Sequence, residues 1–148
     1  MRATAMSSSD HSELYSTLSE LWTLLDTLAA VPPNIVTLPP ADTGTHPPTE
    51  FNADSARAGG FTEEAIAVLA SLPYLQYPLK IQPSTSPRCY LGADLDGRDF
   101  EETREMIEDG PIAGSAIVLT ESSAGIGCYY VYDTEKSRRS HVLTKVLR

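Results

Sequence analysis

The chain has 148 residues, of which 41% are hydrophobic, and it carries a formal net charge of −9 at pH 7. A chain of this length buries roughly 70% of its unfolded surface, so it can form one domain around its own core. The acidic balance argues against nucleic acid and anionic membranes as partners, because both repel a negative surface.

The cysteines and the N-terminal residues indicate where the protein resides. Cys89 and Cys128 are far apart and fit no metal-binding spacing. Residues 1–10 lack the continuous apolar run of a signal peptide, and no stretch of the sequence is long enough to span a bilayer. We therefore expect a cytoplasmic or nuclear protein that has free thiols and is not secreted.

The first predicted element is an amphipathic helix within residues 1–31. Asp10 and Glu13 have the spacing of a capping box, and the prolines that follow Val31 end the helix. Leucines recur at alternating steps of four and three residues along one side, at Leu14, Leu18, Leu21, Leu25 and Leu28. This Leu14–Leu28 stripe is expected to face a core, and a weak dimer through the stripe is the alternative to a monomer.

Residues 32–50 are predicted to form a flexible linker. The segment holds Thr, Gly, Asp and six prolines, namely Pro32, Pro33, Pro39, Pro40, Pro47 and Pro48. Such a composition favours an extended chain without fixed secondary structure, which would act as a spacer. The main domain is then expected to occupy residues 51–148.

Two helices are predicted at the start of this domain. Asn52 or Asp54 starts a short helical turn that Gly59 and Gly60 end. Thr62 is the predicted N-cap of a longer helix with an acidic first turn, which ends before the next proline in the chain. Alanine, isoleucine, valine and leucine supply its buried side.

Two strands and a third helix are expected next. The strands cover residues 74–82 and 88–92, and the proline-rich residues 83–87 turn the chain between them. Residues 98–109 then form a strongly amphipathic helix. One side carries Phe100, Thr103, Met106 and Ile107, and the opposite side carries Glu101, Glu102, Glu105, Glu108 and Asp109.

A hairpin is the predicted centre of the fold. Residues 116–120 and 128–133 are rich in β-branched and aromatic residues, and the loop between them contains two glycines. Residues 141–148 form a last strand beside the hairpin. The fold class is therefore α+β: a small, mostly antiparallel sheet with a central hairpin, packed by two to three helices, with the N-terminal amphipathic helix on a proline-rich linker.

The C-terminal end is basic although the body is acidic. Five of the 11 basic residues lie there, namely Lys136, Arg138, Arg139, Lys145 and Arg148. We expect the last strand to bring Arg138, Arg139 or Lys145 toward the acidic helix and neutralise part of its charge.

Asp94 and Asp96 form the most suggestive acidic motif. A calcium loop starting at Asp94 fails, because Arg98 occupies a ligand position and Asp99 stands where glycine is needed. An Asp-x-Asp metal clamp would rest on a bare tripeptide. A turn that caps the following helix is the favoured interpretation. No metal site and no cofactor is predicted.

Catalytic patterns are equally scarce. His11, His46 and His141 have no second ligand at zinc spacing, and neither cysteine stands in a nucleophile motif. Tyrosines remain as binding candidates, and Tyr130 and Tyr132 share a strand face. Packing within the sheet explains these tyrosines equally well. The candidate binding residues are Tyr90, Asp94, Asp96, Tyr130 and Tyr132.

Residues 51–148, about two-thirds of the chain, resemble a group of uncharacterised small acidic fungal proteins. The matching segments are Phe51-Asn-Ala-Asp-Ser-Ala-Arg-Ala-Gly-Gly-Phe61, Leu72-Pro-Tyr74, Tyr90-Leu-Gly92, Ser115-Ala-Ile-Val-Leu-Thr120 and Tyr132-Asp-Thr134. This group is distantly similar to the SUKH superfamily. The resemblance implies an α+β regulatory or immunity-type module that binds proteins, and it transfers no functional residue.

Two functions follow as hypotheses. The first is a non-enzymatic protein-interaction or regulatory domain with an unidentified protein partner. The second is a small enzyme, or an inactive relative of one, with a pocket near Tyr90, Asp94 and Asp96. A deep pocket with convergent polar groups would favour the enzyme, whereas a shallow charged or aromatic surface would favour the binding domain.

Overall fold

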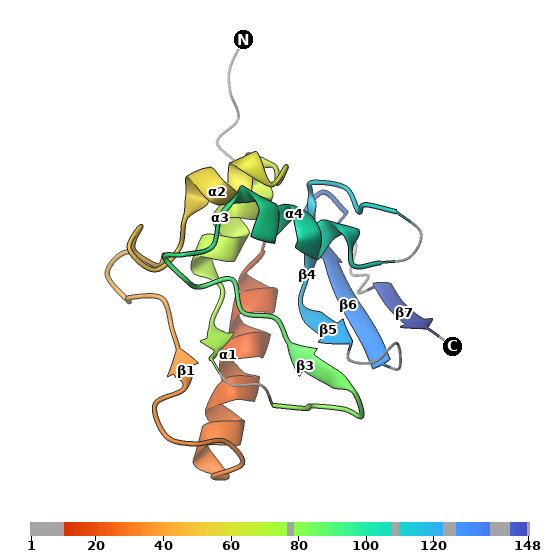
Figure 1. Ribbon diagram of the computed structural model, residues 1–148. Coiled ribbons are helices and arrows are strands. Elements are labelled where there is room, and N and C mark those ends of the chain that lie inside the picture. Colours follow the sequence, from red (N-terminus) through yellow and green to blue (C-terminus); the bar gives the residue numbers. More distant parts are fainter. Residues whose placement is uncertain (1–10, 77–78, 108–109, 123–126, 137–142, 148) are drawn as a thin grey trace.

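The computed structural model describes residues 11–76, 79–107, 110–122, 127–136 and 143–147. Four helices and seven short strands make up this part of the chain, and every strand pair is antiparallel. The predicted α+β class is confirmed. The strands form three small sheets, ordered β1-β2, β3-β5 and β4-β6-β7, where the sequence predicted one sheet. Helices α2, α3 and α4 gather at one end of the molecule and α1 extends away from them (Figure 1).

Helix α1 covers Ser12–Thr27 and is held to the rest of the fold by Trp22. This side chain is 5% exposed, and its Nε1–H donates to the carbonyl oxygen of Pro73 at 3.2 Å. Leu14 and Leu18 pack against the main core. The residue at the N-cap is His11, which makes no capping bond through its side chain, and the predicted cap Asp10 lies outside the described residues.

The proline-rich segment 32–50 differs from its prediction, because it contains fixed secondary structure. Strand β1, Val36–Thr37, pairs with β2, Tyr74–Leu75. Nearer the main domain, His46 is 5% exposed, and its Nε2–H donates to the carbonyl oxygen of Leu72 at 2.8 Å. The prediction of no fixed secondary structure is wrong here, since strand pairing and a buried histidine fasten the segment at two points.

Helices α2 and α3 begin where the sequence predicts. In α2, Ala53–Ala58, the side chain of Asn52 accepts a hydrogen bond from the Ser55 amide. In α3, Glu63–Ser71, the hydroxyl of Thr62 accepts from the Ala65 amide. Both bonds satisfy amide groups that the first turn of a helix leaves without partners.

Helix α4, Gly97–Glu105, carries the predicted amphipathic face, with Phe100 and Thr103 buried. It ends before the predicted boundary at Asp109. The chain turns back after it, so that the amide of Ile112 donates to the carbonyl oxygen of Arg104. The Arg104 guanidinium in turn donates to the carbonyl oxygens of Ile112 and Gly59, and these bonds tie the helix end to α2.

The predicted hairpin is confirmed. Strand β4, Ala116–Val118, pairs with β6, Gly127–Asp133, in the register Ile117↔Tyr132. On the other side of β6 lies β7, Leu143–Leu147, so the predicted last strand also joins the sheet. Strand β5, Thr120–Ser122, lies between β4 and β6 in the chain and pairs with β3, Thr85–Pro87, in a separate sheet.

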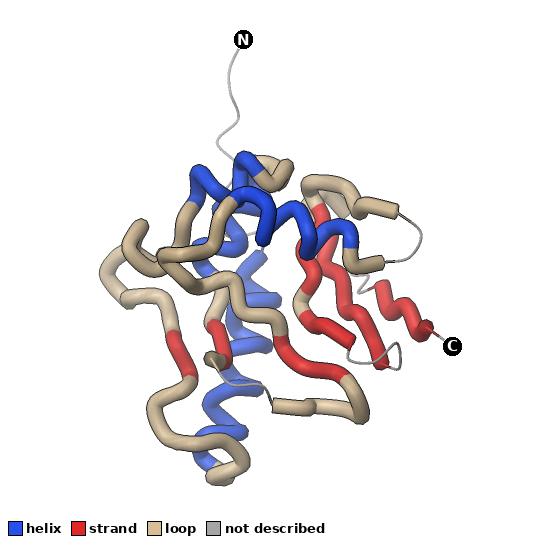
Figure 2. Tube along the Cα trace, viewed as in Figure 1, coloured by secondary structure: helices blue, strands red, loops and turns tan. Residues whose placement is uncertain are grey.

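The region before α4 was predicted less well. Strand β3 covers Thr85–Pro87, where a turn was expected, and β2 holds only two of the residues predicted for the first strand. Residues 88–92 form no strand. Thr85 explains part of the difference, because it is fully buried and its hydroxyl accepts from the Cys128 amide. Figure 2 shows that the chain between β2 and α4 is mostly loop, drawn in tan.

The structure describes only some of the basic C-terminal residues. Lys136 Nζ lies 3.1 Å from the carboxylate of Asp133 at the end of β6. Arg138 and Arg139 lie outside the described residues, and β7 is described by its backbone alone, without the Lys145 side chain. The expected approach of these cations to the acidic helix α4 therefore stays a prediction.

Candidate functional site

Tyr90, one of the predicted binding residues, is a core side chain. It is 2% exposed, its ring stacks on Phe100 at 6.0 Å, and its hydroxyl donates to the Val118 carbonyl oxygen at 2.8 Å. Burial raises the pKa of Tyr90 to about 12. The hydroxyl is therefore a neutral donor that joins the 88–92 segment to β4.

Asp96 caps helix α4, as the sequence predicts. One carboxylate oxygen accepts from the amides of Arg98 and Asp99 at 2.8 and 3.1 Å, and Asp99 accepts from the Asp96 amide in return. This reciprocal pair is a capping box. Asp94 is exposed two residues earlier in the chain.

Replacing Asp96 by alanine is expected to lower the free energy of unfolding by about 1 kcal/mol, because it removes the acceptor for two amides. Asp94→Ala is the matched control and is expected to change stability by less than about 0.5 kcal/mol. Urea unfolding followed by circular dichroism measures both. Equal losses in the two variants would contradict the capping role.

Tyr130 and Tyr132 lie on the same face of β6, as predicted, while Tyr129 and Val131 on the other face are buried. The Tyr130 hydroxyl accepts from the side-chain amide of Gln82 at 3.0 Å. The Tyr132 hydroxyl lies 2.8 Å from His11 Nδ1 at the start of α1. Both rings are half-buried, and both link the sheet to other segments of the chain.

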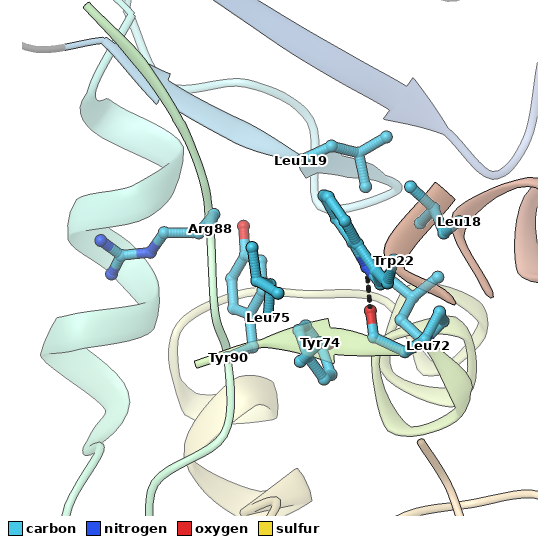
Figure 3. Close-up of a pocket in the computed structure, with 9 residues that line it drawn as sticks. Leu18, Trp22, Leu72, Tyr74, Leu75, Arg88, Tyr90 and Leu119 are labelled. Carbon is cyan, nitrogen blue, oxygen red and sulfur yellow. Dashed lines mark hydrogen bonds between the residues drawn. The ribbon is translucent and has the colours of Figure 1, made fainter. Parts of the chain in front are cut away.

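The structure does not bring the five predicted residues into one pocket. Tyr90 contributes to a small cavity of about 20 Å³, roughly the room of one water molecule. Trp22 lies among these residues, and its Nε1–H donates to the carbonyl oxygen of Pro73 (Figure 3). The Arg88 guanidinium extends away from the other labelled side chains. The cavity is lined by Leu18, Trp22, Leu72, Pro73, Tyr74, Leu75, Arg88, Tyr90 and Leu119.

A larger, open groove lies beside Tyr90, with a volume of about 430 Å³. It is lined by Thr49, Glu50, Gln76, Cys89, Leu91, Gly92 and Ala93. Cys89 and Leu91, the neighbours of Tyr90 in the chain, both line this groove. Burial raises the pKa of the Cys89 thiol, so the thiol is protonated at neutral pH and is a weak nucleophile.

Among the described residues, the exposed large apolar side chains are Leu21, Leu24, Leu28 and Leu38, and the first three lie together on the outer side of α1 and its C-cap. Leu21, Leu24 and Leu28 are 38%, 54% and 65% exposed, and we call these three residues the leucine row. On a helix they fall within one arc, beside the arc of Leu18 and Trp22 that packs inward. The predicted Leu14–Leu28 stripe therefore divides between a half-buried part, with Leu14, Leu18 and Leu25, and an exposed part, with Leu21 and Leu28.

Leu21 and Leu28 belong to the predicted Leu14–Leu28 stripe, for which a core face was expected and a weak dimer was the alternative, whereas Leu24 was not part of that prediction. Leu24 supplies the signal that could have found the leucine row, because it extends the apolar arc of α1 beyond the width that one packed face needs. The row is acidic at its flank, where Glu13 and Glu20 are exposed. From His11 to Glu50 the chain contains no lysine or arginine, and its acids are Glu13, Glu20, Asp26, Asp42 and Glu50.

Comparison with known proteins identifies no relative: no protein-family model, no curated protein and no solved structure matches the chain. Within the described ranges, no helix is long and apolar enough to cross a bilayer. The same ranges hold no group of three or more His, Cys, Asp or Glu side chains arranged for a metal ion.

Proposed function

We propose that the protein is a non-enzymatic protein-interaction domain whose binding surface is the leucine row of α1. The exposure of Leu21, Leu24 and Leu28 carries this proposal, because three neighbouring leucines on one helix leave apolar area in water that a partner can cover. A regulatory role, a cytoplasmic or nuclear location and the distant likeness to SUKH domains belong to the same proposal.

The placement of the row suits a binding surface. Trp22 fixes α1 from its inner side, so the row is presented on a helix that already has its bound shape. A surface that is ordered before binding loses less conformational entropy on association. With 16 residues, α1 is about 24 Å long, so the contact is short and a transient complex is expected.

The alternative of a small enzyme near Tyr90, Asp94 and Asp96 receives less support from the geometry. The Tyr90 hydroxyl is engaged with a backbone carbonyl, and Asp96 is engaged with two helix amides. Neither group is free to take up a proton or a ligand without loss of a structural bond.

Site-directed photo-crosslinking tests the proposed function. A benzoylphenylalanine replacing Leu24 is expected to crosslink to one partner protein in cell extracts. It should crosslink to the same partner when that protein is purified and mixed with this chain. The same residue in place of Glu101, on the exposed face of α4, is the control. Adding Leu21→Glu should weaken the complex at least about tenfold, because a charge then lies in the centre of the contact.

Two results would contradict the proposal. One is equal capture of that protein from positions 24 and 101. The other is binding of the purified partner that is unchanged by Leu21→Glu, since an anchor at the centre of an interface cannot be replaced by a carboxylate without cost.

A further inference from the structure

The leucine row has the spacing of one side of a helix pair. Thr17, Leu21, Leu24 and Leu28 follow one another at steps of four, three and four residues, as the a and d positions of a coiled coil do. Leu18 and Leu25, on one flank of this seam, pack against the body of the domain. The other flank is open to solvent.

The open flank is acidic, and among the described residues it has no counter-charge. Glu13 and Glu20 are seven residues apart and both are exposed, so they occupy equivalent positions beside the seam. No lysine or arginine of the described chain lies within ion-pair distance of either carboxylate. The flanking positions of a helix pair are those that select the partner by charge.

We infer that the partner segment is a basic amphipathic helix, which places apolar side chains on the leucine row and lysine or arginine beside Glu13 and Glu20. The inference rests on the proposed function and names the chemistry of the partner. Apolar contact supplies the affinity, while the opposite charges select the orientation and speed up association.

A second copy of the chain fits this surface less well. A symmetric pair brings the same surface patch of both molecules together. In an antiparallel pair the two acidic flanks would meet, and carboxylates would face carboxylates. Between residues 11 and 50 no lysine or arginine exists to relieve that repulsion. In a parallel pair the acidic flank of each helix would meet the flank of Leu18 and Leu25, which already packs against the domain.

The test uses the full-length chain and a synthetic helical peptide as the probe. The peptide spans about three heptads with leucine at a and d and lysine at e and g. A matched peptide carries glutamate at e and g. Fluorescence anisotropy measures binding of each peptide in about 0.05 M and about 0.5 M salt. The lysine peptide is expected to bind at least about tenfold more tightly in low salt, and its advantage should shrink in high salt.

Variants locate this binding on α1. Glu20→Lys should weaken the lysine peptide by about three- to tenfold, because an attraction becomes a repulsion. Glu101→Lys changes the net charge by the same amount on α4 and should leave the affinity unchanged. Leu24→Ser should weaken both peptides.

Three results would overturn the inference. The first is equal affinity for the two peptides, and the second is an equal loss in Glu20→Lys and Glu101→Lys, which would indicate general attraction to an acidic protein. The third is a dimer in analytical ultracentrifugation that Leu24→Ser abolishes. If instead crosslinking at position 24 identifies a partner whose contacting segment is acidic or uncharged, the inference fails while the proposed function stands.

Discussion

Replacing Phe100 by alanine is expected to lower the free energy of unfolding by about 3–5 kcal/mol, a large part of the stability of a domain of this size. Phe100 is 1% exposed, and its ring lies in edge-to-face contact with Phe51 and Phe61 and in stacked contact with Tyr90, at 6.0 to 6.2 Å between ring centres. Alanine would remove these contacts and leave a cavity that the surrounding rings fill only in part.

The backbone around Phe100 leaves little room for such relaxation. A Cβ atom on Gly59 would lie 2.4 Å from Phe100 Cβ, and one on Gly97 would lie 2.9 Å from Ala58 Cβ. Helices α2 and α4 are therefore already in close contact. They cannot move closer to fill a lost ring without repacking.

Urea unfolding of Phe100→Ala, followed by circular dichroism, measures this effect. Glu101→Ala, one residue further on the exposed face of α4, is the control and should change stability by less than about 0.5 kcal/mol. A loss below about 1 kcal/mol in Phe100→Ala would contradict the central place of the aromatic cluster in the core.

The elements that the sequence predicted correctly depend on nearby residues. The caps at Asn52, Thr62 and Asp96 each accept from amides two or three residues ahead, so the chemistry that fixes these helix starts lies within one turn. The hairpin of β4 and β6 also joins neighbouring segments. Its β-branched and aromatic residues, with glycines between them, predict both the pairing and the direction.

The elements that were missed depend on distant residues. His46 is fixed by a carbonyl 26 residues later, at Leu72, and Thr85 by an amide 43 residues later, at Cys128. Proline content alone predicts a flexible spacer over residues 32–50, because composition does not reveal that a single histidine will be buried against α3. For the same reason a Pro-Ser-Thr-Ser-Pro segment predicts a turn and not a strand.

The candidate site was harder to predict than the fold. Tyr90 and Asp96 are polar residues in conspicuous sequence contexts, yet the structure uses both for internal hydrogen bonds. Two residues of the leucine row, Leu21 and Leu28, belong to a stripe that was predicted to face a core, with a weak dimer as the alternative. Which leucines of α1 remain exposed depends on how much of the helix the domain covers, and only the packed structure shows that.

Trp22→Ala is expected to lower the free energy of unfolding by about 3–5 kcal/mol and to release α1 from the domain. Trp22 is the buried residue of this helix, and it is the centre of a cluster with Val31 and Leu75. Its Nε1–H bond to Pro73 also ties α1 to the end of α3. A helix of 16 residues is only marginally stable without such tertiary contacts.

Two further variants separate the contributions of Trp22 from those of the exposed side of α1. Trp22→Phe keeps most of the apolar area but loses the hydrogen bond, so a loss of about 1–3 kcal/mol is expected, between that of the alanine variant and that of the wild type. Leu24→Ala, on the exposed side of the same helix, should change stability by less than about 0.5 kcal/mol, yet it should weaken the binding of a partner to the leucine row.

Amide hydrogen exchange over residues 12–27 distinguishes local release of α1 from a general loss of stability. In Trp22→Ala, protection should fall further in α1 than in α3, because the contacts removed are among those that hold α1 in place. In Leu24→Ala, both helices should keep their protection. If Trp22→Ala left α1 as protected as in the wild type, the helix would be held by other contacts. The leucine row would then owe its presentation to something other than the tryptophan anchor.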